Sequence, residues 1–280
     1  MALQPAPVKV IAVTSGKGGV GKTNVAANIS VALSNRGRNV MILDADICLA
    51  NIDVLLGLQP KFNLAHVLSG EADLNSTILQ GPRDVRIVPS SSGNQSMMDI
   101  PPSAQAAIIQ AFSTLTDQPD VLVVDTATGI SDSVARFVGA SHQAIVVVCD
   151  EPASLTDAYA LIKVLSTHYG ISHFEIVTNQ TRSESEGNRL YAKLSLVADK
   201  YLDVVLRHLG DIPHDEWLRR AVQEQRSVAD AYPKSAAGQA FARIAAAIDK
   251  RPVRNELNGS IQFFFERLLG AQLHEAVSVG

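Results

Sequence analysis

The residues best suited to chemistry lie in SGKGGVGKT, residues 15–23, directly after the apolar and β-branched run VKVIAVT. The spacing G-x-x-x-x-G-K-[ST] is satisfied by Gly16, Gly21, Lys22 and Thr23. In this pattern backbone N–H groups surround phosphate oxygens, and the helix that follows adds its positive N-terminal dipole. Lys22 would reach the β- and γ-phosphates of ATP, and the Thr23 hydroxyl would hold Mg²⁺. Because residue types, spacing and flanking elements agree, we prefer a nucleotide site to a glycine-rich turn without a ligand.

The ATP contacts of this loop are expected from nearly consecutive residues. They are Gly16, Gly18, Gly19, Val20, Gly21, Lys22, Thr23 and Asn24. A generic phosphate-binding loop does not require a lysine at position 17. Lys17 also lies too far along the loop from Lys22 to share its role in one geometry. From the residues alone, Lys17 is either a solvated loop lysine or a cation with a separate task.

Acidic residues end two of the expected strands. The stretch DVLVVDTATG runs through four apolar residues to Asp125, where a carboxylate can hold Mg²⁺ through a water molecule. Gly129 would let the following loop move with the γ-phosphate. The stretch ILDADICLAN places Asp44 and Asp46 in one turn, where two carboxylates repel each other. The alternative for this pair is that both are ordinary surface charges.

Short β-branched runs alternate with helical patterns along the chain. The expected strands are residues 8–14, 39–46, 85–89, 120–126, 143–150, 174–179 and 204–210. The expected helices include residues 22–37, 101–117, 154–170 and 186–202. Several runs are apolar at nearly every position, as in strands buried on both faces of a parallel sheet. The pattern predicts an α/β fold with a doubly wound, mainly parallel sheet, helices on both faces, and ligands at the carboxyl ends of the strands.

Composition excludes several classes of protein. The 280 residues carry 24 Lys and Arg against 28 Asp and Glu, and this net charge of −4 argues against direct sequence-specific nucleic-acid binding. The two cysteines, Cys48 and Cys149, are far apart and form no CxxC pair, so neither a disulfide framework nor a zinc site is expected. The N-terminus lacks the pattern of a signal peptide, and no apolar run is long enough to cross a bilayer. We expect a cytoplasmic protein.

The loop KGGVGKT resembles the deviant phosphate loop of the MinD/ParA branch of P-loop ATPases. The resemblance implies that Lys17 reaches across a dimer interface to the partner's nucleotide, as an arginine finger supplied in trans would. Hydrolysis would then depend on an ATP-dependent homodimer. The resemblance also implies that Asp46 orients the attacking water and that Asp44 supports it. The adenine-side residues that it implies, at the end of FEIVTN and in the loop GDIPHD, are Asn179, Pro213 and Asp215.

Longer stretches, such as VVDTATGISDSV and GDIPHDEWLRRAVQEQR, resemble the regulators of flagellar number called FlhG or FleN. This implies a slow, regulatory ATPase that binds and inhibits a flagellar master transcription activator. Some members stimulate a GTPase of the signal-recognition type through an N-terminal DQAxxLR segment; MALQPAP does not show that segment, and the GTPase is a further candidate partner. The family's LGLAN and DTAAG are here ICLAN and DTATG, so Cys48 and Thr128 should affect the hydrolysis rate more than nucleotide binding.

Other functions of the same superfamily are alternatives. A septum-placing MinD would share the ATP site, but it normally ends in an amphipathic helix with basic residues for anionic lipid. A ParA-type positioning ATPase would need a basic DNA-facing surface, which the net charge disfavours. An iron–sulfur reductase would need cysteines near the second switch, where neither Cys48 nor Cys149 falls. The remaining alternative is a nucleotide-gated binding module whose hydrolysis is incidental.

A polar stretch holding Pro252 separates the last segment from the rest of the chain. We expect an ATPase domain over residues 1–250, a linker over 251–258, and a C-terminal amphipathic helix and tail over 259–280. The helix would place Ile261, Phe264, Phe265 and Leu268 on one face. Leaving that face in water is costly, so it would dock on the protein's own core, fill a partner's groove, or make reversible peripheral contact with a membrane or the cell pole through residues 259–273.

Overall fold

The computed structural model describes residues 7–46, 51–90 and 101–252. Cys48, most of the expected linker and the whole expected C-terminal helix lie outside the described residues. The predicted division into a domain, a linker and a helix therefore stays a prediction. Within the described ranges, no helix is both long and apolar enough to cross a membrane.

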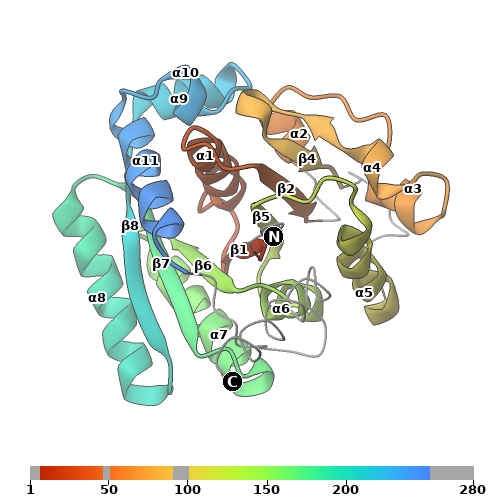
Figure 1. Ribbon diagram of the computed structural model, residues 1–280. Coiled ribbons are helices and arrows are strands. Elements are labelled where there is room, and N and C mark those ends of the chain that lie inside the picture. Colours follow the sequence, from red (N-terminus) through yellow and green to blue (C-terminus); the bar gives the residue numbers. More distant parts are fainter. Residues whose placement is uncertain (1–6, 47–50, 91–100, 253–280) are drawn as a thin grey trace, which may run out of the picture.

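One sheet organises the described chain, with its strands in the order β3-β4-β2-β5-β1-β6-β7-β8 (Figure 1). The strands are β1 (Lys9–Ser15), β2 (Val40–Ala45), β3 (Leu79–Gln80), β4 (Arg86–Val88), β5 (Val121–Thr128), β6 (Gln143–Val148), β7 (His173–Thr181) and β8 (Val205–Pro213). All neighbours pair in parallel except β3, which pairs antiparallel with β4. The predicted mainly parallel, doubly wound sheet is confirmed. The two-residue strand β3 was not predicted, because it is too short to show a pattern.

Helices fill most of the connections between strands. They are α1 (Lys22–Ser34), α2 (Ile52–Leu55), α3 (Leu64–Leu68), α4 (Leu74–Thr77), α5 (Pro102–Ala111), α6 (Asp132–Gly139), α7 (Pro152–Tyr169), α8 (Glu184–Tyr201), α9 (Glu216–Gln223), α10 (Val228–Ala231) and α11 (Ala236–Asp249). The helix expected over 101–117 ends earlier, at Ala111, and a 3-10 turn over Phe112–Thr114 follows. The four-residue helices α2, α4 and α10 were not predicted, since single turns carry no periodicity.

The two faces of the sheet have separate cores. On one face, Ile11 and Val13 of β1 belong to a cluster that includes side chains of α1, α9, α10 and α11. On the other face, Val10 and Ala12 belong to clusters built with α5, α6, α7 and α8. Alternation along β1 therefore assigns successive side chains to opposite layers, as a doubly wound sheet requires. Figure 1 shows the two helical layers on either side of the strands.

The first helix, α1, is held unusually tightly. Most of its side chains are buried, on faces that contact the sheet as well as α10 and α11. Its low amphipathicity follows from this position, because a helix enclosed on most sides has little polar surface to present. A helix fixed in this way also fixes the loop that leads into it, and that loop is the glycine-rich stretch between β1 and α1.

Candidate nucleotide site

The loop from Gly16 to Gly21 turns tightly between the end of β1 and the start of α1. Gly21 directly precedes α1 with φ of +88°, a left-handed conformation that favours glycine. Gly16 approaches α7 so closely that a Cβ there would overlap the Asp157 backbone and lie 2.7 Å from the Ala158 nitrogen. The glycines thus allow a compact turn whose backbone faces an open cleft of about 580 Å³.

The cleft brings together much of the predicted site. Of the predicted residues, those lining it are Gly18, Gly19, Gly21, Lys22, Thr23, Asn24 and Asp46. The residues that sequence reasoning did not single out as contacts are Ser15, Asn51, Val54, Leu55, Thr128, Val222 and Gln225. Val222 and Gln225 lie far along the sequence from the phosphate loop, within GDIPHDEWLRRAVQEQR, a stretch that carries the family resemblance, but these two residues were not linked to the nucleotide. Thr128, the departure from the family's DTAAG, ends β5 at the cleft.

Lys22 and Asp125 form a buried ion pair at the base of the cleft. The Lys22 Nζ lies 2.7 Å from Asp125 Oδ1, and the two side chains are 6% and 1% exposed. The second carboxylate oxygen, Asp125 Oδ2, is buried without a hydrogen-bond partner in the described part of the chain. Burial raises the pKa of Asp125, while Lys22 and the Thr23 hydroxyl act in the opposite direction. The site therefore holds a cation, a hydroxyl and an acceptor oxygen close together.

Asp44 lies beside Asp125 because the parallel register of β2 and β5 pairs the two residues. Its carboxylate is 1% exposed and accepts backbone N–H groups from Asp46 (3.1 Å), Asn51 (3.1 Å) and Ile52 (3.3 Å). Burial, and then the negative charge of Asp125, raise the pKa of Asp44 well above its ordinary value. Asp44 is thus an inner residue that orders the turn carrying Asp46, whereas Asp46 itself lines the cleft.

Lys17 lies apart from the residues that line the cleft. Its ammonium group pairs with the carboxylate of Glu151, the residue that precedes α7. The hydrogen bond to Glu151 raises the pKa of Lys17, so the lysine is charged at neutral pH. Both side chains are accessible, with exposures of 33% for Lys17 and 55% for Glu151. The two lysines of the loop therefore have different surroundings, one buried against Asp125 and one at the surface.

The three residues predicted on the adenine side do not line the cleft. Asn179 lies behind the loop, where its Nδ2 donates to the Val20 carbonyl at 2.8 Å and its Oδ1 is buried without a partner among the described residues. Asp215 caps two helices by accepting the N–H groups of Trp217 and Ala237, each at 2.8 Å. Pro213 ends β8. Their contacts with adenine stay predictions, and their observed roles are structural.

The residues present fit a nucleotide with Mg²⁺. Mg²⁺ at phosphate sites usually takes one or two protein oxygens and completes its shell with phosphate and water. The Thr23 hydroxyl and the orphaned Asp125 Oδ2 are oxygens of that kind. In the ranges that the structure describes, no group of three or more His, Cys, Asp or Glu could hold a metal on its own. Thr23 and Asp125 as metal-side residues remain predictions.

Comparison with known proteins gives the chain its relatives. The family described as "ParA: NUBPL iron-transfer P-loop NTPase" matches residues 7–249. The antiactivator FleN of Pseudomonas aeruginosa is 53% identical over 94% of both chains. The flagellum site-determining protein YlxH of Helicobacter pylori is 33% identical over 93% of this chain and 90% of its own.

A solved structure has the same fold and a nucleotide. The septum site-determining protein MinD of Pyrococcus horikoshii, complexed with Mg-ADP, is 28% identical and has a TM-score of 0.72. The match covers 91% of this chain and all of that one. Sequence, fold and the geometry of the phosphate loop agree, and the chain belongs to the ParA/MinD family of P-loop NTPases.

Proposed function

We propose that this protein is a slow ATPase that works as a dimerising switch and regulates flagellar number by binding and inhibiting a flagellar transcription activator. The flagellar role is supported by the similarity to the antiactivator FleN and to YlxH, both of which align along most of their length. The switch is supported by one observation above all: Lys22 lies buried in the cleft, whereas Lys17 of the same loop lies outside it, paired with Glu151.

In this proposal different residues of the site bind the phosphates and the metal. The backbone of the loop and Lys22 would hold the phosphates, Thr23 would hold Mg²⁺, and Asp125 would hold it through a water molecule. The metal supplies neutralisation of phosphate charge when it is bound. Asp46, at the wall of the cleft, would orient a water molecule, and Asp44 would keep its turn in place through three backbone hydrogen bonds.

The surface around the cleft suits a second copy of the chain. Val54, Ile130 and Val222 expose 57%, 48% and 39% of their area, and Val54 and Val222 line the cleft itself. Ile130 follows Gly129, whose φ of +91° sits at the turn after β5. Exposed apolar side chains close together, such as Val54 and Val222 at the cleft, are typical of an interaction site. A dimer that faces cleft to cleft would cover them and bring each Lys17 toward the partner's nucleotide.

Lys17 must leave Glu151 to act in the partner. An ion pair between exposed side chains contributes little to stability, because water and salt screen it. Glu151 therefore orients the Lys17 side chain only weakly, and the side chain can leave at little cost in free energy. Dimerisation has to compensate for the loss of this weak pair, and the gain of a phosphate contact is a stronger, charge-assisted interaction.

The switch is tested by substituting the two lysines separately. Lys17→Ala should retain ATP binding, because Lys22 and the loop backbone remain, but should lose ATP-dependent dimerisation and most ATP turnover. Lys22→Ala should lose nucleotide binding itself. Fluorescent-ATP titration, analytical ultracentrifugation with and without ATP, and phosphate release measure the three properties. An ATP-induced dimer with wild-type turnover in Lys17→Ala would refute the role of Lys17.

The regulatory output needs a second experiment, with Asp46→Ala as the variant that binds ATP without turning it over. If the protein is a switch, Asp46→Ala should retain the activator partner in pull-downs and fail to release it when ATP is washed out. If it is a binding module with incidental hydrolysis, capture and release should match wild type. Recovery of septum components instead of a flagellar activator in the pull-down would favour the MinD-like alternative.

A further inference from the structure

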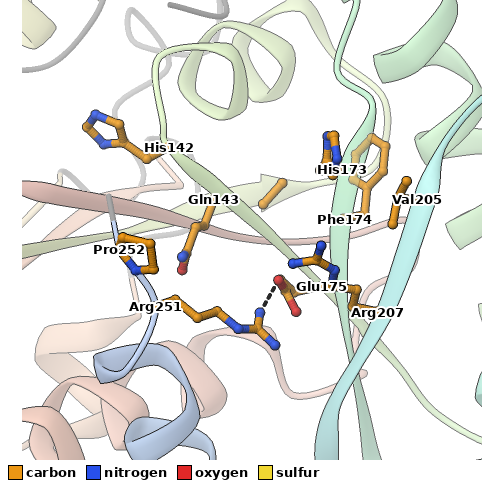
Figure 2. Close-up of a pocket in the computed structure, with 10 residues that line it drawn as sticks. His142, Gln143, His173, Phe174, Glu175, Val205, Arg207, Arg251 and Pro252 are labelled. Atoms are coloured by element: carbon orange, nitrogen blue, oxygen red, sulfur yellow. Dashed lines mark ion pairs between the residues drawn. The ribbon is translucent and has the colours of Figure 1, made fainter. Parts of the chain in front are cut away.

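A second cavity opens at the opposite edge of the sheet from the nucleotide cleft. It measures about 190 Å³ and is formed around the first residues of β6, β7 and β8 and the end of α11 (Figure 2). Its lining residues are His142, Gln143, Ala144, His173, Phe174, Glu175, Val205, Arg207, Arg251 and Pro252. None of these residues lines the cleft or belongs to the motifs that the nucleotide uses.

A buried lysine outside the lining, Lys9, holds the Arg251 backbone that forms part of the cavity. The Lys9 ammonium donates to the carbonyl oxygens of Ile248 and Arg251, at 2.7 and 2.6 Å, at the C-terminal end of α11. A cation there adds a donor to the carbonyls at the end of the helix and interacts favourably with the helix dipole. These bonds fix the backbone of Arg251 over the start of β1. From there the Arg251 side chain reaches the carboxylate of Glu175 (Figure 2).

Glu175 presents an unused acceptor. The residue is only 9% exposed, and its Oε1 makes the ion pair with Arg251. Its other oxygen, Oε2, is buried and has no hydrogen-bond partner among the described residues. Buried polar atoms are nearly always paired, because an unpaired one costs free energy. An unpaired carboxylate oxygen at the wall of a cavity indicates a place for a donor group from a ligand.

Arg207 supplies a free cation next to that acceptor. It is the register partner of Glu175 in the parallel pair β7–β8, so the two side chains leave the same face of the sheet side by side. Figure 2 shows the Arg207 guanidinium beside Glu175. Within residues 7–46, 51–90 and 101–252, the Arg207 guanidinium has neither an ion pair nor a hydrogen bond. Because Glu175 pairs with Arg251, the positive charge of Arg207 has no counter-ion among the described residues.

His142, one of the two histidines that line the cavity, does not change this charge balance. Burial, and secondarily the charge of Lys9, lower the pKa of His142 to about 4, so it is neutral at physiological pH. Its Nδ1 accepts the Val10 N–H at 3.1 Å, and its ring turns away from Glu175 in Figure 2. Among the arginine and carboxylate side chains that line the cavity, Arg207 and Arg251 outnumber Glu175 by one positive charge.

We propose that this cavity binds a small α-amino or α-hydroxy carboxylic acid. The ligand carboxylate pairs with Arg207, whose planar guanidinium matches a carboxylate in a bidentate contact. The adjacent amino or hydroxyl group donates to Glu175 Oε2. In this class of molecule the carboxylate and the amino or hydroxyl group are on adjacent carbons. Arg207 and Glu175, which would bind these two groups, are register partners on adjacent strands. The volume of about 190 Å³ restricts the ligand to a compact molecule.

The test uses the full chain and a panel of the common α-amino acids, lactate and glycolate. Saturation-transfer NMR identifies binders, and isothermal titration gives their affinity. We expect at least one binder, and its amine analogue without the carboxylate should not bind. Arg207→Gln should weaken binding at least about tenfold, the usual effect of losing a charge-assisted hydrogen bond. Glu175→Gln should weaken it as well, because Arg251 loses its partner and the free carboxylate oxygen is lost.

Arg189→Gln is the matched control, since Arg189 is an exposed arginine on α8 outside the cavity. It should bind the acid with wild-type affinity, and all variants should bind fluorescent ATP as wild type does, which verifies the fold. The proposal is wrong if no member of the panel binds. It is equally wrong if Arg207→Gln binds the acid as tightly as the wild type and the Arg189 control.

Discussion

Replacing Lys22 by methionine should destabilise the protein in the absence of any nucleotide. Methionine has nearly the length of lysine but no charge, so Asp125 would be left buried at 1% exposure beside Asp44 without a cation. At the observed separation of 2.7 Å, and with an effective dielectric constant of about 20, the lost attraction is about 6 kcal/mol. Removing one partner of a buried pair typically costs about 3–5 kcal/mol, which is the loss we expect.

The predicted loss depends on pH in a definite direction. Burial raises the folded-state pKa of both Asp125 and Asp44 above their unfolded values. For groups shifted this way, stability is greatest below the unfolded pKa and falls as pH rises through the raised folded pKa. Losing Lys22 raises the pKa of Asp125 further. The difference between Lys22→Met and wild type should therefore shrink as the pH is lowered from 7.5 toward 5.

Urea denaturation followed by circular dichroism, without nucleotide, measures both effects. Lys17→Met is the matched control, since it removes a lysine of the same loop whose ion pair is exposed, and its midpoint should stay near that of wild type. The double variant Lys22→Met/Asp125→Asn should regain part of the lost stability, because no unpaired carboxylate remains at position 125. A Lys22→Met protein as stable as wild type, or a double variant less stable than the single one, would refute the reasoning.

Three further outcomes follow from the site. Gly16→Ala should lower the free energy of unfolding by about 1–3 kcal/mol, because its Cβ would overlap the backbone of α7, and urea titration measures this. Asn179→Ala should weaken ATP binding about tenfold by removing the hydrogen bond that supports the Val20 carbonyl; a fluorescent-ATP titration with unchanged affinity contradicts it. Glu151→Gln should free Lys17 and shift ATP-dependent dimerisation to lower protein concentration in ultracentrifugation, whereas a shift to higher concentration would mean that Glu151 assists the dimer.

The strand ends were the most predictable part of the molecule. Asp44 and Asp125 each close an apolar run, and parallel pairing places the ends of such runs at the same edge, so their proximity followed from the sequence. The phosphate loop was predictable for a similar reason, because its motif is local and its flanking elements are strong. The helix over residues 101–117 was placed correctly but ended at Ala111, since helix ends depend on local packing as well as on periodicity.

The contacts that sequence reasoning missed join residues far apart along the chain. Lys9 and Arg251 meet although 242 positions separate them, and neither belongs to a motif. Asn179 was predicted to contact adenine, which stays a prediction; its support of the loop was not predicted, because it depends on the Asn179 side chain reaching from β7 to the Val20 carbonyl. Pairing of Lys17 with Glu151 likewise depends on how β6 lies next to β1, which a linear pattern does not specify. These contacts are set by the order in which the strands lie in the sheet, which local sequence patterns do not reveal.

The support that Asn179 gives to Val20 also bears on the order of events during synthesis. The two residues are 159 positions apart, so at a translation rate of about 5–20 residues per second roughly 8–30 s separate their appearance. The central strand β1 likewise waits for β5 and β6 before either of its edges is paired. The segment made first is therefore among the last to acquire its final shape. We expect ATP to reach its full affinity only once the chain has passed residue 179, so the nucleotide is a weak template for the nascent polypeptide.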